Sequence, residues 1–140
     1  MRRIMLGMGV TSKKVWIQGG LRVSTANNPN CEVRWGWHVA PTLCVRGPGL
    51  FRTTEMVIDP ALFSAPVSVA GWQGVQGDPG ATLTPSDGSV FYLWGTGSGL
   101  SWGSYTDPAY SQTNSVLAFY RLQLQARALS ASGPPPYACP

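Results

Sequence analysis

Residues 35–63 read WGWHVAPTLCVRGPGLFRTTEMVIDPALF, and this stretch decides the fold. It contains two runs typical of β-strands, 35–45 and 51–58, separated by the turn sequence RGPG at 46–49. The pattern predicts an antiparallel β-hairpin. Directly after the second strand, Asp59-Pro60 is a favourable start for a short helical turn, PALF, in which the aspartate is the N-cap.

The predicted hairpin brings the single histidine of the chain close to an aspartate. If the turn is centred between Pro48 and Gly49, residues whose numbers sum to 97 face each other, and His38 faces Asp59. Directly opposite residues have Cβ atoms about 4.5–5.5 Å apart, so the carboxylate could orient the imidazole as in nucleophilic hydrolases. The alternative is structural, with His38 as a packing residue and Asp59 as a helix cap. A slip of one residue in register would place the two on opposite faces.

The flanking sequence predicts an α+β domain with an antiparallel sheet and few helices. Further strands are expected at 15–17, 21–25 and 90–94, and helices at 1–8, at 66–73 and from Thr113 or Asn114 to Leu129. Residues 77–89 and 95–110, rich in Gly, Ser and Pro, are expected to be loops. The domain is expected to span residues 1–129, followed by a Pro-rich disordered tail at 130–140.

The composition narrows the classes of protein to which the chain can belong. A chain of 140 residues with 44% hydrophobic residues forms one domain with a real core, which excludes wholesale disorder. The formal net charge is +4, but the cations are scattered, so we expect neither a nucleic-acid partner nor a membrane partner. No apolar run approaches the ~20 residues of a membrane span. A monomer is expected.

Three cysteines, Cys31, Cys44 and Cys139, show no zinc-ligand spacing, and the odd number leaves at least one thiol unpaired. Alternation along the strand places Cys44 on the same face as His38, but six residues along a strand correspond to about 20 Å. Cys44 is therefore expected to be a core residue. Cys31 in a loop and Cys139 in the tail are not expected to be nucleophiles either.

Several aromatic residues are candidates for binding. Trp35 and Trp37 flank Gly36 just before the histidine; they could line a substrate cleft or simply pack in the core, and alternation predicts both to lie opposite His38. Trp102 and Tyr105, in the stretch expected to be a loop, could contact a partner.

Four runs occur in this order along the chain: MRRIMLGMG, KKVWIQGGLRVST, WGWHVAP, and MVIDPALFSAPV followed by Trp72. Together they resemble the bacterial protein-glutamine glutaminases, also called protein glutamine deamidases. The resemblance runs from Met1 to about Trp94 and continues loosely into the last predicted helix. Its most specific parts are the W-x-[YW]-H-V-A and I-D-P-[SA]-L-F blocks.

The resemblance implies a transglutaminase/papain-like fold and hydrolysis of the side-chain amide of protein-bound glutamine by a Cys-His-Asp triad. On this reading His38 is the general base and Asp59 orients it. The family's nucleophile belongs to a C-Y-A-R-A-H-type segment, which we expect upstream of Met1, within about two helical turns. None of the three cysteines occupies that motif position, so the 140 residues alone are expected to be inactive.

The resemblance also implies protein substrates that present exposed glutamine, no cofactor, no metal, and secretion or delivery as an effector. The alternative function is that of a non-catalytic relative, which would bind protein partners through a cleft lined by Trp35 and Trp37.

Overall fold

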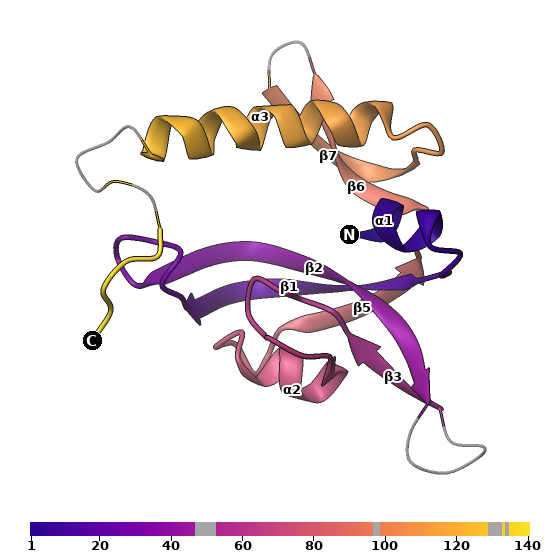
Figure 1. Cartoon of the computed structure of the whole chain (residues 1–140), viewed down its shortest axis with the longest axis horizontal. Helices are drawn as coiled ribbons and strands as arrows, with labels where there is room; N and C mark the ends of the chain where they lie inside the picture. Colours follow the sequence, from indigo (N-terminus) through magenta and orange to yellow (C-terminus); the bar gives the residue numbers. More distant parts are fainter. Residues whose placement is uncertain (47–52, 97–98, 129–132, 134) are drawn as a thin grey trace.

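The computed structural model describes residues 1–46, 53–96, 99–128, 133 and 135–140 (Figure 1). Its centre is a five-stranded antiparallel sheet in the order β4-β3-β2-β1-β5, and β6 and β7 form a separate pair. The strands are β1 (Lys13–Ser24), β2 (Glu32–Arg46), β3 (Thr53–Val57), β4 (Val67–Ser68), β5 (Thr82–Asp87), β6 (Val90–Thr96) and β7 (Gly99–Thr106). The helices are α1 (Arg2–Gly7), α2 (Val69–Gly74) and α3 (Ser111–Ala128).

These elements form layers around the central sheet. Helix α2 covers one face, whereas α3 and the β6–β7 pair lie on the other (Figure 1). The predicted α+β class with an antiparallel sheet and few helices is confirmed. Among the described residues, no helix is long and apolar enough to cross a membrane.

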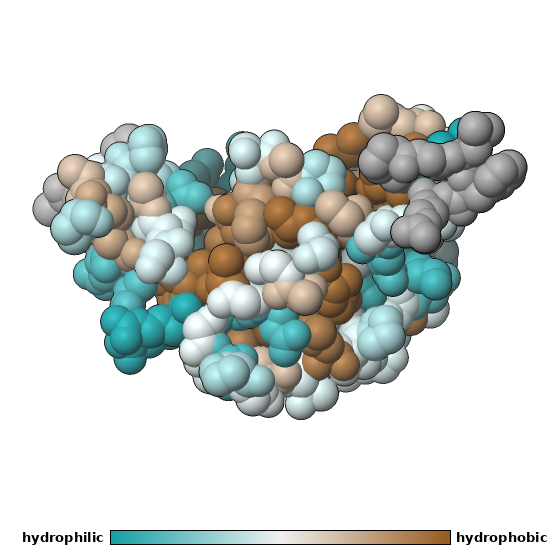
Figure 2. Space-filling view, turned by 90° about the horizontal axis from the view of Figure 1, so that it is seen from below, coloured by the Kyte–Doolittle hydropathy of each residue, from teal (hydrophilic) through white to brown (hydrophobic). Residues whose placement is uncertain are grey.

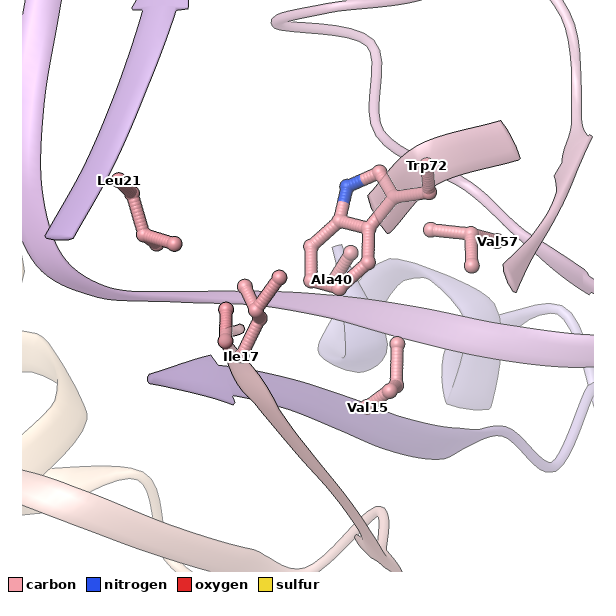
Figure 3. Packing of buried hydrophobic residues seen from close by; sticks show 7 residues of the cluster. Val15, Ile17, Leu21, Ala40, Val57 and Trp72 are labelled. Carbon is pink, nitrogen blue, oxygen red and sulfur yellow. The ribbon is translucent and has the colours of Figure 1, made fainter. Parts of the chain in front are cut away.

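The hydrophobic core lies between the sheet and α2. Alternate residues of β1 and β2 point to this side, and Trp72 of α2 packs against them with no exposed surface (Figure 3). Burial of each large apolar side chain contributes about 1.5–3 kcal/mol. Ser68 caps α2, because its hydroxyl accepts a hydrogen bond from the backbone N–H of Gly71 at 3.0 Å. Seen from the α2 side, apolar residues also gather at the surface over the middle of the molecule (Figure 2).

The two strands predicted at 15–17 and 21–25 are a single strand, β1. Gly19 and Gly20 do not end it, because the ladder to β2 continues on both sides of a register shift between Gln18 and Leu21. Position 19 leaves no room for a larger residue as the chain stands, since a Cβ atom there would lie 2.4 Å from Oδ2 of Asp78 and 2.9 Å from Cβ of Ala81. The pair is thus a bulge inside a strand.

Two stretches predicted to be loops contain strands. Residues 77–89 include β5, which among the described residues pairs with β1 alone and is therefore an edge strand that tolerates Pro85. Residues 95–110 include the end of β6 and all of β7, which pair as a hairpin. Neither stretch has the apolar alternation that marks a half-buried strand. Residues 47–49 of the tight turn predicted at 46–49 lie outside the described residues, as does Leu129, the predicted end of the last helix, whereas Arg46 ends β2.

Two polar contacts stabilise the layer on the other face of the sheet: one joins β6 to β1, and the other caps α3. Lys14 of β1 donates a hydrogen bond from Nζ to the carbonyl of Val90 at 2.7 Å, and burial, together with the nearby Arg2 charge, lowers the pKa of Lys14 to about 8. Helix α3 is capped by Asp107, whose carboxylate accepts from the backbone N–H of Thr113 at 2.7 Å. The predicted cap at Thr113 or Asn114 was therefore wrong: the capping carboxylate lies earlier in the chain, and it takes up the free N–H groups of the first turn.

A disulfide links Cys31, between β1 and β2, to Cys139 at the end of the chain. In addition, the backbone N–H of Tyr137 donates to the carbonyl of Ala26 at 2.7 Å. The described residues of the tail form no helix or strand, yet they are bonded to the segment between β1 and β2. The predicted boundary between a domain at 1–129 and a disordered tail at 130–140 stays a prediction.

Cys44 has the unpaired thiol that the odd number of cysteines predicted. The prediction that it is a core residue was wrong, because Cys44 is exposed. Buried residues of β2 end at Thr42, and positions 44–46 extend past the part of the sheet that the core covers. Strand periodicity predicts the face on which a side chain lies, but not whether another layer covers it.

Candidate active site

The hairpin formed by β2 and β3 brings His38 and Asp59 together, as predicted. Nε2 of His38 lies 2.7 Å from Oδ2 of Asp59. The register differs from the predicted one, since Thr42 pairs with Val57 and partner numbers sum to 99. A shift of two residues keeps every side chain on the same face. Asp59 therefore still lies on the face of the sheet that carries His38.

Asp59 performs two structural tasks at once. Its Oδ2 atom also accepts a hydrogen bond from Nε1 of Trp72 at 2.8 Å, and its Oδ1 atom accepts from the backbone N–H of Ala61 at 3.2 Å. The predicted helical turn forms after it, because its carbonyl accepts from Leu62 and Phe63. Burial by itself would raise the pKa of Asp59, but the hydrogen bonds from His38, Trp72 and Ala61 outweigh it and hold this pKa below its ordinary value.

Two indole rings enclose the imidazole of His38. The ring of Trp35 stacks on it with centroids 4.6 Å apart, and the ring of Trp72 lies at 5.5 Å. Only 18% of the His38 side chain is exposed. Within the described residues, Nδ1 of His38 makes no hydrogen bond, and this atom is not fully buried. With the Nε2 proton directed at Asp59, Nδ1 carries the lone pair and is open to a reactant.

The two tryptophans before His38 lie in different places. The prediction that both lie opposite His38 is confirmed for Trp37, which contacts Trp16 at a centroid distance of 5.9 Å. It was wrong for Trp35, which stacks on His38 and packs against the core. The bulge opposite Gly36 interrupts the alternation on which the prediction relied. The two indoles therefore do not line one cleft.

We refer to His38, Asp59, Trp35 and Trp72 as the His38 cluster. The remaining candidates lie outside this cluster. Tyr105 is half-buried against Phe91. The side chain of Trp102 is not among those that the structure describes. Cys31 and Cys139 are bonded to each other, and Cys44 lies six residues along β2 from His38, about 20 Å away. Within the described ranges no group of three metal-ligating side chains occurs.

Trp72 is the member of the cluster whose role sequence reasoning missed. It binds the same carboxylate oxygen as His38 and anchors the core, yet a single tryptophan in a short helix has no distinctive pattern. Its position thirteen residues after Asp59, in a segment capped by Ser68, was the available signal.

Replacing Asp59 with asparagine should lower the free energy of unfolding by about 2 kcal/mol at pH 7, because charged acceptors contribute about 1.5–3 kcal/mol. A carboxylate whose pKa is lowered on folding stabilises the protein above its unfolded pKa, and this contribution is lost as the pH falls through the folded value. Urea denaturation from pH 7 to pH 2 should therefore show the parent approaching the variant at the acidic end. A constant difference between them would contradict the assignment.

Comparison with known proteins now identifies the family. A family model described as glutaminase matches residues 1–76, more than half of the chain. The chain belongs to the glutaminase family. The matched residues include all four members of the cluster described above, His38, Asp59, Trp35 and Trp72. No curated protein sequence gives a significant match.

Solved structures agree with this membership. The crystal structure of a protein-glutaminase superposes with a TM-score of 0.67 at 28% identity, over 86% of this glutaminase-family chain and 64% of that chain. The NMR structure of protein-glutaminase from Chryseobacterium proteolyticum gives 0.68 at 27% identity, over 99% and 70%. A pro-protein-glutaminase crystal structure gives 0.66 at 28%, over 98% and 46%. The chain thus spans less than two thirds of the length of the first of these proteins.

Proposed function

We propose that this chain supplies the general base and the orienting carboxylate of a cysteine-type amidohydrolase, which converts protein-bound glutamine to glutamate and ammonia. The observation that carries the proposal is the contact between His38 and Asp59, with Nδ1 of the imidazole left open. Membership of the glutaminase family and the likeness to solved protein-glutaminases support glutamine deamidation as the reaction.

The proposed mechanism follows from the two nitrogens of His38. Nδ1 takes the proton of a cysteine thiol, and the thiolate attacks the carboxamide carbon of glutamine. The resulting imidazolium gives this proton to the departing nitrogen, which leaves as ammonia and creates a thioester. Nδ1 then takes a proton from water, whose oxygen attacks the thioester. The C–S bond of the thioester then breaks, and the imidazolium returns the proton to the departing sulfur. The products are glutamate and the free thiol, and one water is consumed for each ammonia released.

Asp59 and the two indoles position the base. The carboxylate fixes the tautomer by accepting the Nε2 proton, and it stabilises the imidazolium once this forms. Trp35 and Trp72 hold the plane of the ring by stacking on its two sides. Because Trp72 is bonded to the same oxygen, the carboxylate cannot rotate away without leaving a buried indole N–H unpaired.

The nucleophile in this proposal is a cysteine outside residues 1–140. The cysteines in the chain are unsuitable, since two form the disulfide and Cys44 lies far along β2. The test is ammonia release from a glutamine-containing model protein, by this chain and by a longer form that includes the residues encoded before Met1. Activity in the longer form only is expected. Activity of the 140 residues alone would refute this nucleophile, and no activity in either form would refute the function.

Secretion, or delivery as an effector, belongs to the same proposal. The disulfide between Cys31 and Cys139 supports it, because such bonds persist in oxidising compartments and are rare in the cytosol. Fractionation of cells that express the natural gene would test this part, and accumulation of the reduced protein in the cytosol would contradict it.

A further inference from the structure

The bulge between β1 and β2 decides where Trp35 lies. Residues 19–20 of β1 face the single residue Gly36 of β2, and Trp35 is the next residue of β2 in the ladder. Trp35 pairs with Leu21, which is a fully buried member of the core. The ring of Trp35 is thereby brought to the core face, where it stacks on His38 with centroids 4.6 Å apart. An uninterrupted alternation would have placed it on the opposite face of the sheet.

A segment outside the hairpin runs along β1 at this bulge. The ladder between β1 and β5 ends where the bulge begins, and the residues just before β5 take the place of a partner strand. The backbone N–H of Arg22 donates to the carbonyl of Gln76 at 2.8 Å. The backbone N–H of Gly20, in the bulge itself, donates to Oδ2 of Asp78 at 2.7 Å. The two backbones are in close contact, because a Cβ atom at Gly77 would collide with the carbonyl oxygen of Arg22.

The carboxylate of Asp78 is held in place by its own turn. Its Oδ1 atom accepts from the backbone N–H of Gly80 at 2.9 Å, and its carbonyl accepts from the N–H of Ala81 at 3.2 Å. Its Oδ2 atom is left for the bulge, where it binds Gly20 and leaves no room for a side chain at Gly19. Hydrogen bonds to a charged acceptor are roughly twice as strong as neutral ones. The shape of the bulge therefore depends on where this carboxylate lies.

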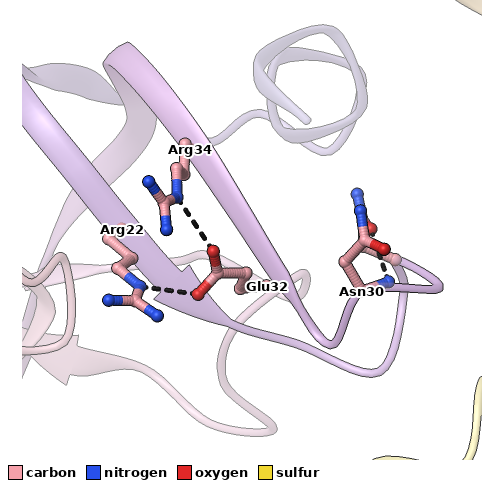
Figure 4. A network of polar contacts seen from close by, with 5 residues as sticks. Arg22, Asn30, Glu32 and Arg34 are labelled. Carbon is pink, nitrogen blue, oxygen red and sulfur yellow. Dashed lines mark hydrogen bonds and ion pairs between the residues drawn. The ribbon is translucent and has the colours of Figure 1, made fainter.

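The hairpin beyond the bulge has a fixed register. The ladder continues regularly from the pair Leu21 and Trp35 to the end of β1, and Glu32 binds two arginines there (Figure 4). Nε of Arg22 lies 2.5 Å from one carboxylate oxygen of Glu32, and Nε of Arg34 lies 2.8 Å from the other. A slip of the ladder would separate Glu32 from both guanidinium groups. The bulge is thus confined between two regular stretches, and Asp78 contacts it from outside the hairpin.

We propose that Asp78 is a positioning residue for the general base. Its carboxylate holds the bulge in the shape that brings Trp35 onto the imidazole of His38, and Trp35 in turn holds the plane of that ring. The inference rests on the proposed function, because it concerns the orientation of the same base. Asp78 acts through the backbone of β1 and takes no part in the chemistry.

The proton NMR signals of the imidazole test the proposal in the 140-residue chain without requiring catalysis. His38 is the single histidine, so its Hε1 and Hδ2 signals are unambiguous, and a stacked indole shifts them upfield. Trp35→Ala measures the part of this shift that Trp35 causes, with all spectra compared where the ring is neutral. Asp78→Ala should remove most of that part. The double variant should lose no more than Trp35→Ala alone, because both changes act on one contact.

Two further variants sharpen the test. Asp87→Ala is the matched control, since Asp87 lies at the far end of β5 and likewise accepts from a backbone N–H in its own turn, that of Ser89 at 2.7 Å. It should leave the imidazole signals where they are in the parent. Asp78→Asn keeps one acceptor oxygen and should give an intermediate shift. Parent-like signals in folded Asp78→Ala, or in Asp78→Asn if the alanine variant does not fold, would overturn the proposal. An equal change in Asp87→Ala would do the same.

Ammonia release separates this inference from the proposed function. In the longer form, Asp78→Ala should lower kcat about tenfold and leave KM nearly unchanged, because a tilted base impairs proton transfer and not substrate binding. A parental kcat in Asp78→Ala would overturn the positioning role and leave the function intact. The expected NMR changes without ammonia release in any form would overturn the function, and would leave Asp78 as the residue that orients the ring.

Discussion

Replacing His38 with alanine should lower kcat/KM for glutamine deamidation at least about a thousandfold in the form of the protein that releases ammonia. A positioned general acid–base contributes about 10²–10⁴-fold, and here the same imidazole serves both proton transfers. Loss of the ring also removes the partner of Asp59, but Trp72 and Ala61 still bind that carboxylate, so the fold should persist. Ammonia release and circular dichroism measure the two effects separately.

Rescue by free imidazole provides the control for this variant. The space left between Trp35 and Trp72 has the size and stacking geometry of the lost ring, so added imidazole should restore part of the rate. A purely structural role for His38 would not respond to imidazole. Activity of the alanine variant within tenfold of the parent would refute His38 as the base.

Breaking the disulfide should produce the largest loss of stability. Cys31 and Cys139 are 108 residues apart, and closing a loop of about 100 residues contributes about 4–5 kcal/mol in the chain-entropy model. The variant Cys139→Ser should therefore unfold at a lower denaturant concentration by that free energy. Urea titration of the oxidised parent and the variant measures the difference, and reductant should affect only the parent.

Cys44→Ser is the matched control for the loss of a thiol. Cys44 is exposed and unpaired, so its replacement should change the free energy of unfolding by less than about 0.5 kcal/mol. If Cys139→Ser is no less stable than Cys44→Ser, the tail contributes nothing to the fold, and the bond is incidental.

The central hairpin and the pair His38 and Asp59 could be predicted from the sequence. Apolar runs flanking a Gly-Pro turn define the hairpin, and the face on which each residue lies depends only on whether the register shift is odd or even. The assumed register was wrong by two residues, and the contact was still correct. The α+β class followed from the elements predicted along the whole chain, and the resemblance to the glutaminases from four runs between Met1 and Trp72, two of which lie in or overlap this hairpin.

The features that were missed depend on tertiary contacts. Trp35 lies beside His38 because the bulge at Gly19 and Gly20 of β1, opposite Gly36, breaks the alternation, and this pairing cannot be read from the residues near Trp35 alone. Strand β5 is held by pairing with β1 and not by its own apolar pattern. The bond from Trp72 to Asp59 joins a six-residue helix to a turn, and local propensity carries no information about it.

The double role of Trp72 couples the loss of the active-site geometry to the unfolding of the core. Its ring fills the centre of the core while its indole N–H holds the carboxylate that orients His38. Loosening of the core therefore disturbs the site at the same time, and no partly melted state should retain an ordered base. Loss of function on heating should follow the melting of tertiary structure as one cooperative event. Variants that repack the core for heat resistance would then disturb the orientation of a histidine that they do not replace.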